Sequence, residues 1–209
     1  MSRRYKPYRR ENKRSFVNTK QEEEGIILEI LDPSNNRKRG KYAEASIIQV
    51  VGTAWFTLLE IVPKDVNLLS LGDKIKIDKN EDNNIESIIG RVSFDDLTRV
   101  AELQFNDSFD KMIDDREAWY VNWLNKAMPI SLRYHSLNLI DGIGPKYLKK
   151  ILEVRKENEF LSFDDFENRT GISNIKNLIK DRVMTELTDD TEKYNVFTRR
   201  NPNQRQDRR

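Results

Sequence analysis

The sequence predicts an α+β protein in which a small five-stranded β-barrel precedes an all-helical domain. Short segments rich in Ile, Val and Thr, separated by turn residues, fill the first part of the chain; after them, apolar residues recur at steps of three and four. Both ends are strongly basic. We therefore divide the chain into a basic disordered arm, a barrel, connecting helices, a helical domain and a basic tail, over residues 1–21, 22–93, 94–130, 131–190 and 191–209.

Two cationic arms flank an acidic body. Residues 1–20 carry a net charge of +7 and residues 198–209 carry +4, so residues 21–197 must carry −9 to give the total of +2. The arms are too poor in aliphatic residues to offset the entropy of ordering, which predicts disorder. Such arms suit phosphate groups of nucleic acid, although a merely solubilising tail is the alternative. The candidate contacts are Arg3, Arg4, Arg9, Arg10 and Arg14.

Short strands are expected throughout the first domain, and no long helix pattern interrupts them. Gly52 and Thr53 supply the turn of a hairpin between the second and third strands. The resulting small barrel is of oligonucleotide-binding (OB) or SH3-like type, and both remain open. The predicted strands span residues 24–31, 46–51, 54–61, 71–77 and 85–92.

The loop after the first strand is the candidate binding loop of the barrel. Arg37, Lys38 and Arg39 are adjacent cations in a turn-rich segment, and loops of such barrels commonly contact phosphate; a solvated loop is the alternative. On a regular strand, Trp55 and Phe56 would point to opposite faces. Each is expected in the core or in a domain contact rather than against a base.

Helices are expected to connect the two domains. One short helix is predicted over residues 95–105, and a longer amphipathic helix begins near Asn106 or Asp107 and ends before Pro129. A further helix over residues 131–139 leads into the helical domain. His135 on that helix is expected to pack or to contact phosphate rather than to catalyse.

The segment LIDGIGPKYLKKIL, residues 139–152, has the residue order of a phosphate-binding hairpin between two helices. Gly142 can adopt the positive φ that ends a helix, Gly144 admits a ligand close to the backbone, and Pro145 suits the first helical position. The free N–H groups that follow favour an anion. A simple helix cap is the alternative. The candidate residues are Gly142, Ile143, Gly144, Lys146, Lys149 and Lys150.

This segment resembles the helix-hairpin-helix motif of sequence-independent DNA- and RNA-binding proteins. The resemblance implies a tandem unit with pseudo-two-fold symmetry, in which residues 162–172 are the linker and residues 174–187 supply the last helix of a second hairpin. The second copy departs from the pattern because Ser173 stands where the second glycine is expected. We therefore do not expect it to bind phosphate.

The sequence does not indicate an enzyme. It contains no cysteine, one histidine and no phosphate-loop motif. The pairs Asp114–Asp115 and Asp164–Asp165 are adjacent carboxylates, which point to different sides of a helix rather than to one metal ion. We expect no catalytic residue, no metal site and no cofactor.

Over residues 22–187, the succession of barrel and hairpins is similar to an uncharacterised archaeal protein family, chiefly through the segments GIGPK and SFDDFE. The resemblance brings no established activity. Relatives are encoded near a ribosomal RNA dimethyladenosine transferase, which favours structured RNA or the ribosome as the target.

The expected function is therefore non-enzymatic nucleic-acid binding, with ribosomal RNA or the ribosome as the favoured partner. Two alternatives are a duplex-DNA-binding accessory of repair or recombination, and a scaffold protein whose acidic body docks a basic protein. The chain has no run of about twenty apolar residues and its N-terminus is too charged for a secretory signal. A cytoplasmic protein without a membrane partner is expected.

Overall fold

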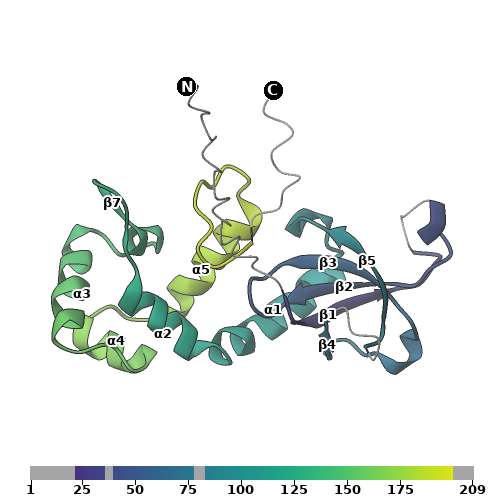
Figure 1. Cartoon of the computed structure of the whole chain (residues 1–209), viewed down its shortest axis with the longest axis horizontal. Helices are drawn as coiled ribbons and strands as arrows, with labels where there is room; N and C mark the ends of the chain where they lie inside the picture. The colour runs from purple at the N-terminus through teal and green to yellow at the C-terminus, as the bar shows by residue number, and fades with distance from the viewer. Residues whose placement is uncertain (1–21, 36–39, 78–82, 200–209) are drawn as a thin grey trace, which may run out of the picture.

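The computed structural model describes residues 22–35, 40–77 and 83–199. Figure 1 shows a five-stranded sheet at one end of the molecule and the helices α3 and α4 at the other, with α1, α2 and α5 between them. The elements are β1 (Glu24–Leu31), β2 (Ile47–Gly52), β3 (Leu58–Pro63), β4 (Lys74–Lys76), β5 (Ile85–Arg91), α1 (Arg99–Asp114), α2 (Glu117–Lys126), β6 (Pro129–Ser131), β7 (Tyr134–His135), α3 (Pro145–Glu157), α4 (Phe163–Thr170) and α5 (Ile175–Thr188).

The five predicted strands form one antiparallel sheet in the order β4-β1-β2-β3-β5, curled into a half-barrel. Register shifts in β1 and between β3 and β5 are of the kind that bends a sheet. Every residue of β2 and β3 is buried because both faces of the sheet are covered. Ile27 packs with Ile48 and Val50 on one face, while Leu28 belongs to the cluster that includes the helices.

Trp55 and Phe56 lie in the turn before β3 rather than on a strand, so the expectation of opposite faces is wrong. Phe56 adopts an uncommon positive φ of 51° and meets the ring of Phe109 edge-on, with 5.5 Å between centroids. Trp55 meets Trp119 in the same way at 5.6 Å. Both rings therefore join the sheet to α1 and α2, as the expectation of a core or domain contact required.

The helical break predicted at Asn106 or Asp107 is wrong, because α1 runs unbroken through both residues. Phe105 and Phe109 are buried on the same side of α1, and their packing outweighs the capping preference of the two residues between them. The helix begins after Thr98, whose hydroxyl accepts a hydrogen bond from the N–H of Ala101 at 3.1 Å. α2 ends before Pro129, as predicted.

The helix predicted over residues 131–139 is also wrong. The chain forms the two-stranded ribbon β6–β7 and then the short 3-10 helix η4 (Ser136–Leu139). His135 begins η4 by accepting a hydrogen bond from the N–H of Leu137. The buried side chains of Leu137 and Leu139 then fix this short segment against the core, where a longer helix was expected.

The prediction of a tail from residue 191 onward is wrong for residues 191–199. Phe197 is fully buried and meets Tyr120 and Trp123 with centroid distances of 5.4 and 4.8 Å. Thr198 is 1% exposed. In this terminal segment, residues 191–199, Phe197 and Thr198 are therefore part of the core between the sheet and the helices, whereas Thr191 and Lys193 are exposed.

Candidate nucleic-acid interface

The chain reverses direction at Gly142 immediately before α3. The N–H of Ile143 donates to the carbonyl oxygen of Ile140 at 3.1 Å, and Gly142 in this turn has a φ of +86°. Glycine adopts that conformation without the steric cost of a side chain. The side chain of Asn138 donates to the carbonyl oxygen of Ile143 at 2.8 Å. Ile143 itself is buried, so its side chain anchors the hairpin, while Gly142 and Gly144 are exposed.

The first turn of α3 presents N–H groups without a partner. Within the described part of the chain, the N–H groups of Gly144, Lys146 and Tyr147 have no hydrogen-bond acceptor; the first helical bond runs from Leu148 to the carbonyl oxygen of Gly144 at 2.9 Å. Pro145 at the first helical position has no N–H to satisfy. These donors and the positive end of the helix dipole lie together, which favours an anion.

The surroundings of these N–H groups are open and cationic. A Cβ added to Gly144 would meet no atom within 4 Å, so a ligand has room to approach the backbone. Lys146, Lys149 and Lys150 are all exposed on α3. Lys149 lies 3.8 Å from Glu153, a distance at which an exposed ion pair contributes little. The six candidate residues of this hairpin are therefore adjacent, and five of them are exposed to solvent.

The second hairpin has a different geometry. Gly171 has a positive φ of 76°, as Gly142 does, but Asn174 also adopts a positive φ before α5 begins at Ile175. The carboxylate of Glu167 accepts a hydrogen bond from the N–H of Ile175 at 2.8 Å. A carboxylate of the protein thus already occupies the anion position, and its charge would repel a phosphate.

A hollow lies beside the first hairpin, with an empty volume of about 900 Å³ including its open mouth. Asn138 and Asp141 line it on the hairpin side, and Lys193 lines it from the terminal segment. The ring centroids of Tyr134 and Tyr194 lie 6.4 Å apart, with an interplanar angle of 27°. Both tyrosines were missed by the sequence analysis because they are far apart in the chain, although the pair Lys193–Tyr194 is a basic-aromatic signal.

His135 follows Tyr134 in the chain and is buried, and its Nδ1 accepts the hydrogen bond from the N–H of Leu137 at 3.1 Å. Burial, and then the positive charge of Arg155, hold the pKa of His135 below its usual value. The guanidinium of Arg155 donates to the carbonyl oxygens of Leu124 and Ala127, both at 2.9 Å, and so is fixed nearby. His135 therefore packs as a neutral cap, one of the two roles expected for it.

We expect acidification to destabilise the protein through His135. The unfolded chain binds the proton with an ordinary pKa near 6.5, whereas the folded chain binds it only at lower pH, so the stability due to this histidine falls as pH falls below about 6.5. His135→Asn keeps an acceptor for Leu137 but does not titrate. Its melting temperature should fall less between pH 7 and pH 5 than that of the wild type, and equal decreases would contradict the assignment.

Two groups of candidate residues lie outside the described residues: the arm residues Arg3, Arg4, Arg9, Arg10 and Arg14, and the loop residues Arg37, Lys38 and Arg39.

The carboxylate pairs considered for metal chemistry have lysine or backbone partners. Asp114 lies 2.7 Å from Lys176, and Asp115 lies 3.1 Å from Lys74. Asp165 accepts from the N–H of Leu161, which, with Arg169, lowers the pKa of its carboxyl group. Residues 22–35, 40–77 and 83–199 contain no group of three or more histidine or acidic side chains that could hold a metal ion. None of the helices in these ranges is long and apolar enough to cross a membrane.

The curled sheet, which packs on α1, and the helices that follow it define the class: an α+β protein with an exposed glycine turn before α3 and exposed lysines beside that turn. The chain belongs to the DUF655 family, described as a protein of unknown function, whose family model matches residues 21–199.

Relatives of this chain come from archaea. It is 32% identical over 154 residues to the uncharacterized protein MJ0038 of Methanocaldococcus jannaschii, covering 73% of this chain and 70% of that protein. The crystal structure of Af1531 from Archaeoglobus fulgidus, of the same family, is similar with a TM-score of 0.71 and 30% identity, over 85% of this chain and 100% of that one. The predicted membership of an uncharacterised archaeal family is thereby confirmed.

A third similarity is short. A stretch of 36 residues is 56% identical to part of the PolC-type DNA polymerase III of Mycoplasmopsis pulmonis, covering 17% of this chain and 2% of that protein. A match of this extent carries no activity over to this chain.

Proposed function

We propose that this protein is a non-enzymatic nucleic-acid-binding protein that holds backbone phosphate on the hairpin before α3. The observation that carries the proposal is the group of three N–H donors at Gly144, Lys146 and Tyr147, which have no acceptor among the described residues and lie beside exposed lysines. Backbone N–H donors, a helix N-terminus and exposed lysine side chains together can bind a phosphate diester whatever the base sequence.

In this proposal, η4, the turn at Gly142 and α3 form a helix-hairpin-helix unit whose first helix is shortened to a 3-10 turn. The half-barrel is the OB or SH3-like module of the same protein. Its loop at Arg37, Lys38 and Arg39 and the cationic arms add further phosphate contacts. The second hairpin contributes to packing, since the carboxylate of Glu167 already binds its first free N–H.

RNA is the favoured target because a hollow with two tyrosines adjoins the phosphate site. Sequence-independent proteins bind unpaired bases by stacking them on aromatic rings. The ring centroids of Tyr134 and Tyr194 lie 6.4 Å apart and their planes are inclined by 27°, so the two rings form one aromatic surface on which an unpaired base can stack. Tyr134 stands on the exposed β6–β7 ribbon and is 38% exposed, so a base can reach its ring.

A binding comparison tests this function. Fluorescence anisotropy with single-stranded RNA, a ribosomal RNA stem-loop and duplex DNA, all at one salt concentration, should show the tightest binding for RNA with unpaired bases. Tighter binding to duplex DNA would favour the repair or recombination alternative. If none of the three binds at about 10 µM protein in low salt, where even non-specific complexes form, the proposed function is wrong.

The tyrosine hollow yields a second expectation. Tyr134→Ala should weaken binding to single-stranded RNA about five- to hundredfold, since stacking of one base contributes about 1 to 3 kcal/mol, and should leave duplex DNA binding unchanged. Leu132→Ala on the same ribbon is the matched control, because Leu132 is fully exposed. Equal effects of the two substitutions would show that Tyr134 does not stack on a base.

A further inference from the structure

The two ends of the described chain meet at one loop, residues 53–57 before β3. The carboxylate of Glu22 accepts hydrogen bonds from the N–H groups of Ala54 at 2.9 Å and of Trp55 and Thr57 at 3.0 Å. At the other end, the N–H of Arg199 donates to the carbonyl oxygen of Trp55 at 3.1 Å. Residues 1–21, with a net charge of +7, and residues 200–209, with +3, therefore join the body at the same place.

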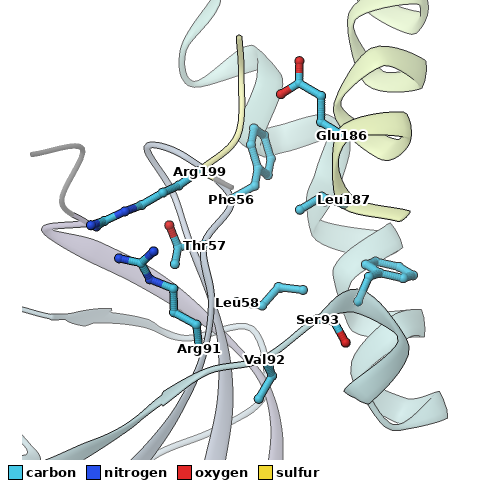
Figure 2. Close-up of a pocket in the computed structure, with 10 residues that line it drawn as sticks. Phe56, Thr57, Leu58, Arg91, Val92, Ser93, Glu186, Leu187 and Arg199 are labelled. Carbon is cyan, nitrogen blue, oxygen red and sulfur yellow. The ribbon is translucent and has the colours of Figure 1, made fainter. Parts of the chain in front are cut away.

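A small hollow opens beside this loop, and Figure 2 shows two arginines reaching it from different elements. Arg91 comes from the end of β5, and Arg199 comes from the terminal segment. Their guanidinium groups extend to the same side, with the hydroxyl of Thr57 next to them. The hollow has an empty volume of about 340 Å³ including its open mouth.

The hydroxyl of Thr57 is the unexplained group of this hollow. Thr57 is 5% exposed, and its Oγ1 is buried without any hydrogen-bond partner. A buried polar group without a partner costs about 1 to 3 kcal/mol, so such groups normally face a ligand or a water molecule. The backbone of Thr57 is already used, since its N–H donates to Glu22 and its carbonyl oxygen accepts from Gly52.

Two arginines, Arg91 and Arg199, and one carboxylate, Glu186, line the hollow. Burial, and then the nearby charge of Arg199, lower the pKa of Arg91, and Glu22 only partly offsets this. Within the described residues, Arg91 makes no ion pair within 4 Å. The carboxylate of Glu22 is engaged by three N–H groups, and that of Glu186 by the terminal segment and Arg182. An anion between the arginines would relieve their repulsion.

We propose that Arg91, Arg199 and Thr57 form a second phosphate site, which binds one phosphate group at the root of both arms. Two guanidinium groups and one hydroxyl match the acceptor oxygens of a phosphate, and arginine is the side chain best suited to bind it by two parallel hydrogen bonds. The ligand is either a backbone phosphate of nucleic acid or free phosphate. Its assignment to nucleic acid rests on the proposed function; the site itself does not.

Thr57→Val separates this proposal from a merely structural role, because valine has nearly the shape of threonine and lacks the hydroxyl. If Thr57 binds no ligand, Thr57→Val should be as stable as the wild type or more stable, and its affinity for phosphate should equal that of the wild type. In the proposed site, folding stability is likewise retained, but the phosphate affinity should fall about two- to tenfold. Arg91→Gln should reduce it about tenfold or more. Arg99→Gln, an exposed arginine on α1, is the control with the same loss of charge.

The experiment measures two quantities on the full chain. First, the melting temperature is recorded against inorganic phosphate at constant ionic strength. The wild type should gain about 3 to 5 °C at ten times the dissociation constant, and the gain should be smaller in Arg91→Gln and Thr57→Val but not in Arg99→Gln. The double variant Gly144→Glu/Lys146→Glu alters the first hairpin but not this site. Phosphate should therefore still raise its melting temperature, and adding Arg91→Gln should reduce that rise.

Second, RNA binding is measured against salt concentration. If the site holds a backbone phosphate, Arg91→Gln should lower the slope of log affinity against log salt by about 0.7 to 0.9. A phosphate-dependent stabilisation without this change of slope would assign the site to free phosphate. If Arg91→Gln and Thr57→Val change neither quantity relative to Arg99→Gln, the proposal is wrong. If the wild type binds no nucleic acid, the function proposed above fails, while the phosphate titration still decides on this site.

Discussion

The double substitution Gly144→Glu/Lys146→Glu should reduce nucleic-acid affinity about a hundredfold at constant salt. It places a carboxylate in front of the free N–H groups of α3 and reverses the adjacent lysine, so phosphate loses charge-assisted hydrogen bonds worth about 1.5 to 3 kcal/mol each and meets repulsion. Anisotropy titration with labelled RNA measures the effect. The protein should still fold, because a Cβ at Gly144 meets no atom within 4 Å and its φ is −79°.

The matched control is Ser173→Glu/Lys156→Glu. It makes the same change of charge in the same helical unit, but at the second hairpin and at the far end of α3, where both residues are exposed. We expect its nucleic-acid affinity to fall only about threefold or less, because the added negative charge weakens the attraction of the whole protein for phosphate. If both double variants lose affinity equally, the hairpin acts through net charge alone and is a helix cap rather than a phosphate site.

Glu186→Ala should lower the stability of folding by about 3 to 5 kcal/mol, which corresponds to a fall in melting temperature of about 6 to 20 °C. The carboxylate of Glu186 accepts from the N–H groups of Val196, Phe197 and Thr198 at 2.8 to 3.0 Å. It also lies 2.9 Å from the guanidinium of Arg182, whose side chain is only 6% exposed. Removing it leaves a buried cation and several N–H groups without their partner.

Glu157→Ala on α3 is the control, since Glu157 is exposed and its loss should change stability by less than about 0.5 kcal/mol. Limited trypsin digestion gives a second readout, because release of the terminal segment would expose Arg199, which is partly buried in the folded protein, to cleavage. If Glu186→Ala has the melting temperature and the digestion pattern of the wild type, the packing of Phe197 rather than this carboxylate holds the segment in place.

Much of the sheet was predictable because its signals are local. β1 occupies the predicted residues 24–31, and β2 and β3 form the predicted hairpin, but its loop spans residues 53–57 because Gly52 is the last residue of β2. Strand residues alternate between two covered faces, so their apolar character is visible in a few consecutive residues. The hairpin before α3 was likewise recognisable, since the positive φ at Gly142 and the helix start at Pro145 depend on single residue types.

The errors occurred where distant contacts outweighed local preferences. Asn106 and Asp107 are good capping residues, yet α1 continues through them. Phe105 and Phe109 on either side are both buried in the core that the sheet shares with the helices. The segment 131–139 has no strong strand pattern, but the ribbon and η4 form around buried His135 and Leu137. In each case, burial of a few side chains contributes more than the propensity of the residues between them.

By itself, the sequence determined the α+β class, the succession of five strands, the glycine turn before α3 and the distribution of charge. These depend on residue types within a turn or two of one another. Only the tertiary structure decided that Tyr134 approaches Tyr194, that Phe197 and Thr198 are core, and that Arg91, Arg199 and Thr57 share one hollow. These long-range contacts depend on how the sheet and helices pack, because residues far apart in the chain carry no local signal of where their partners will lie.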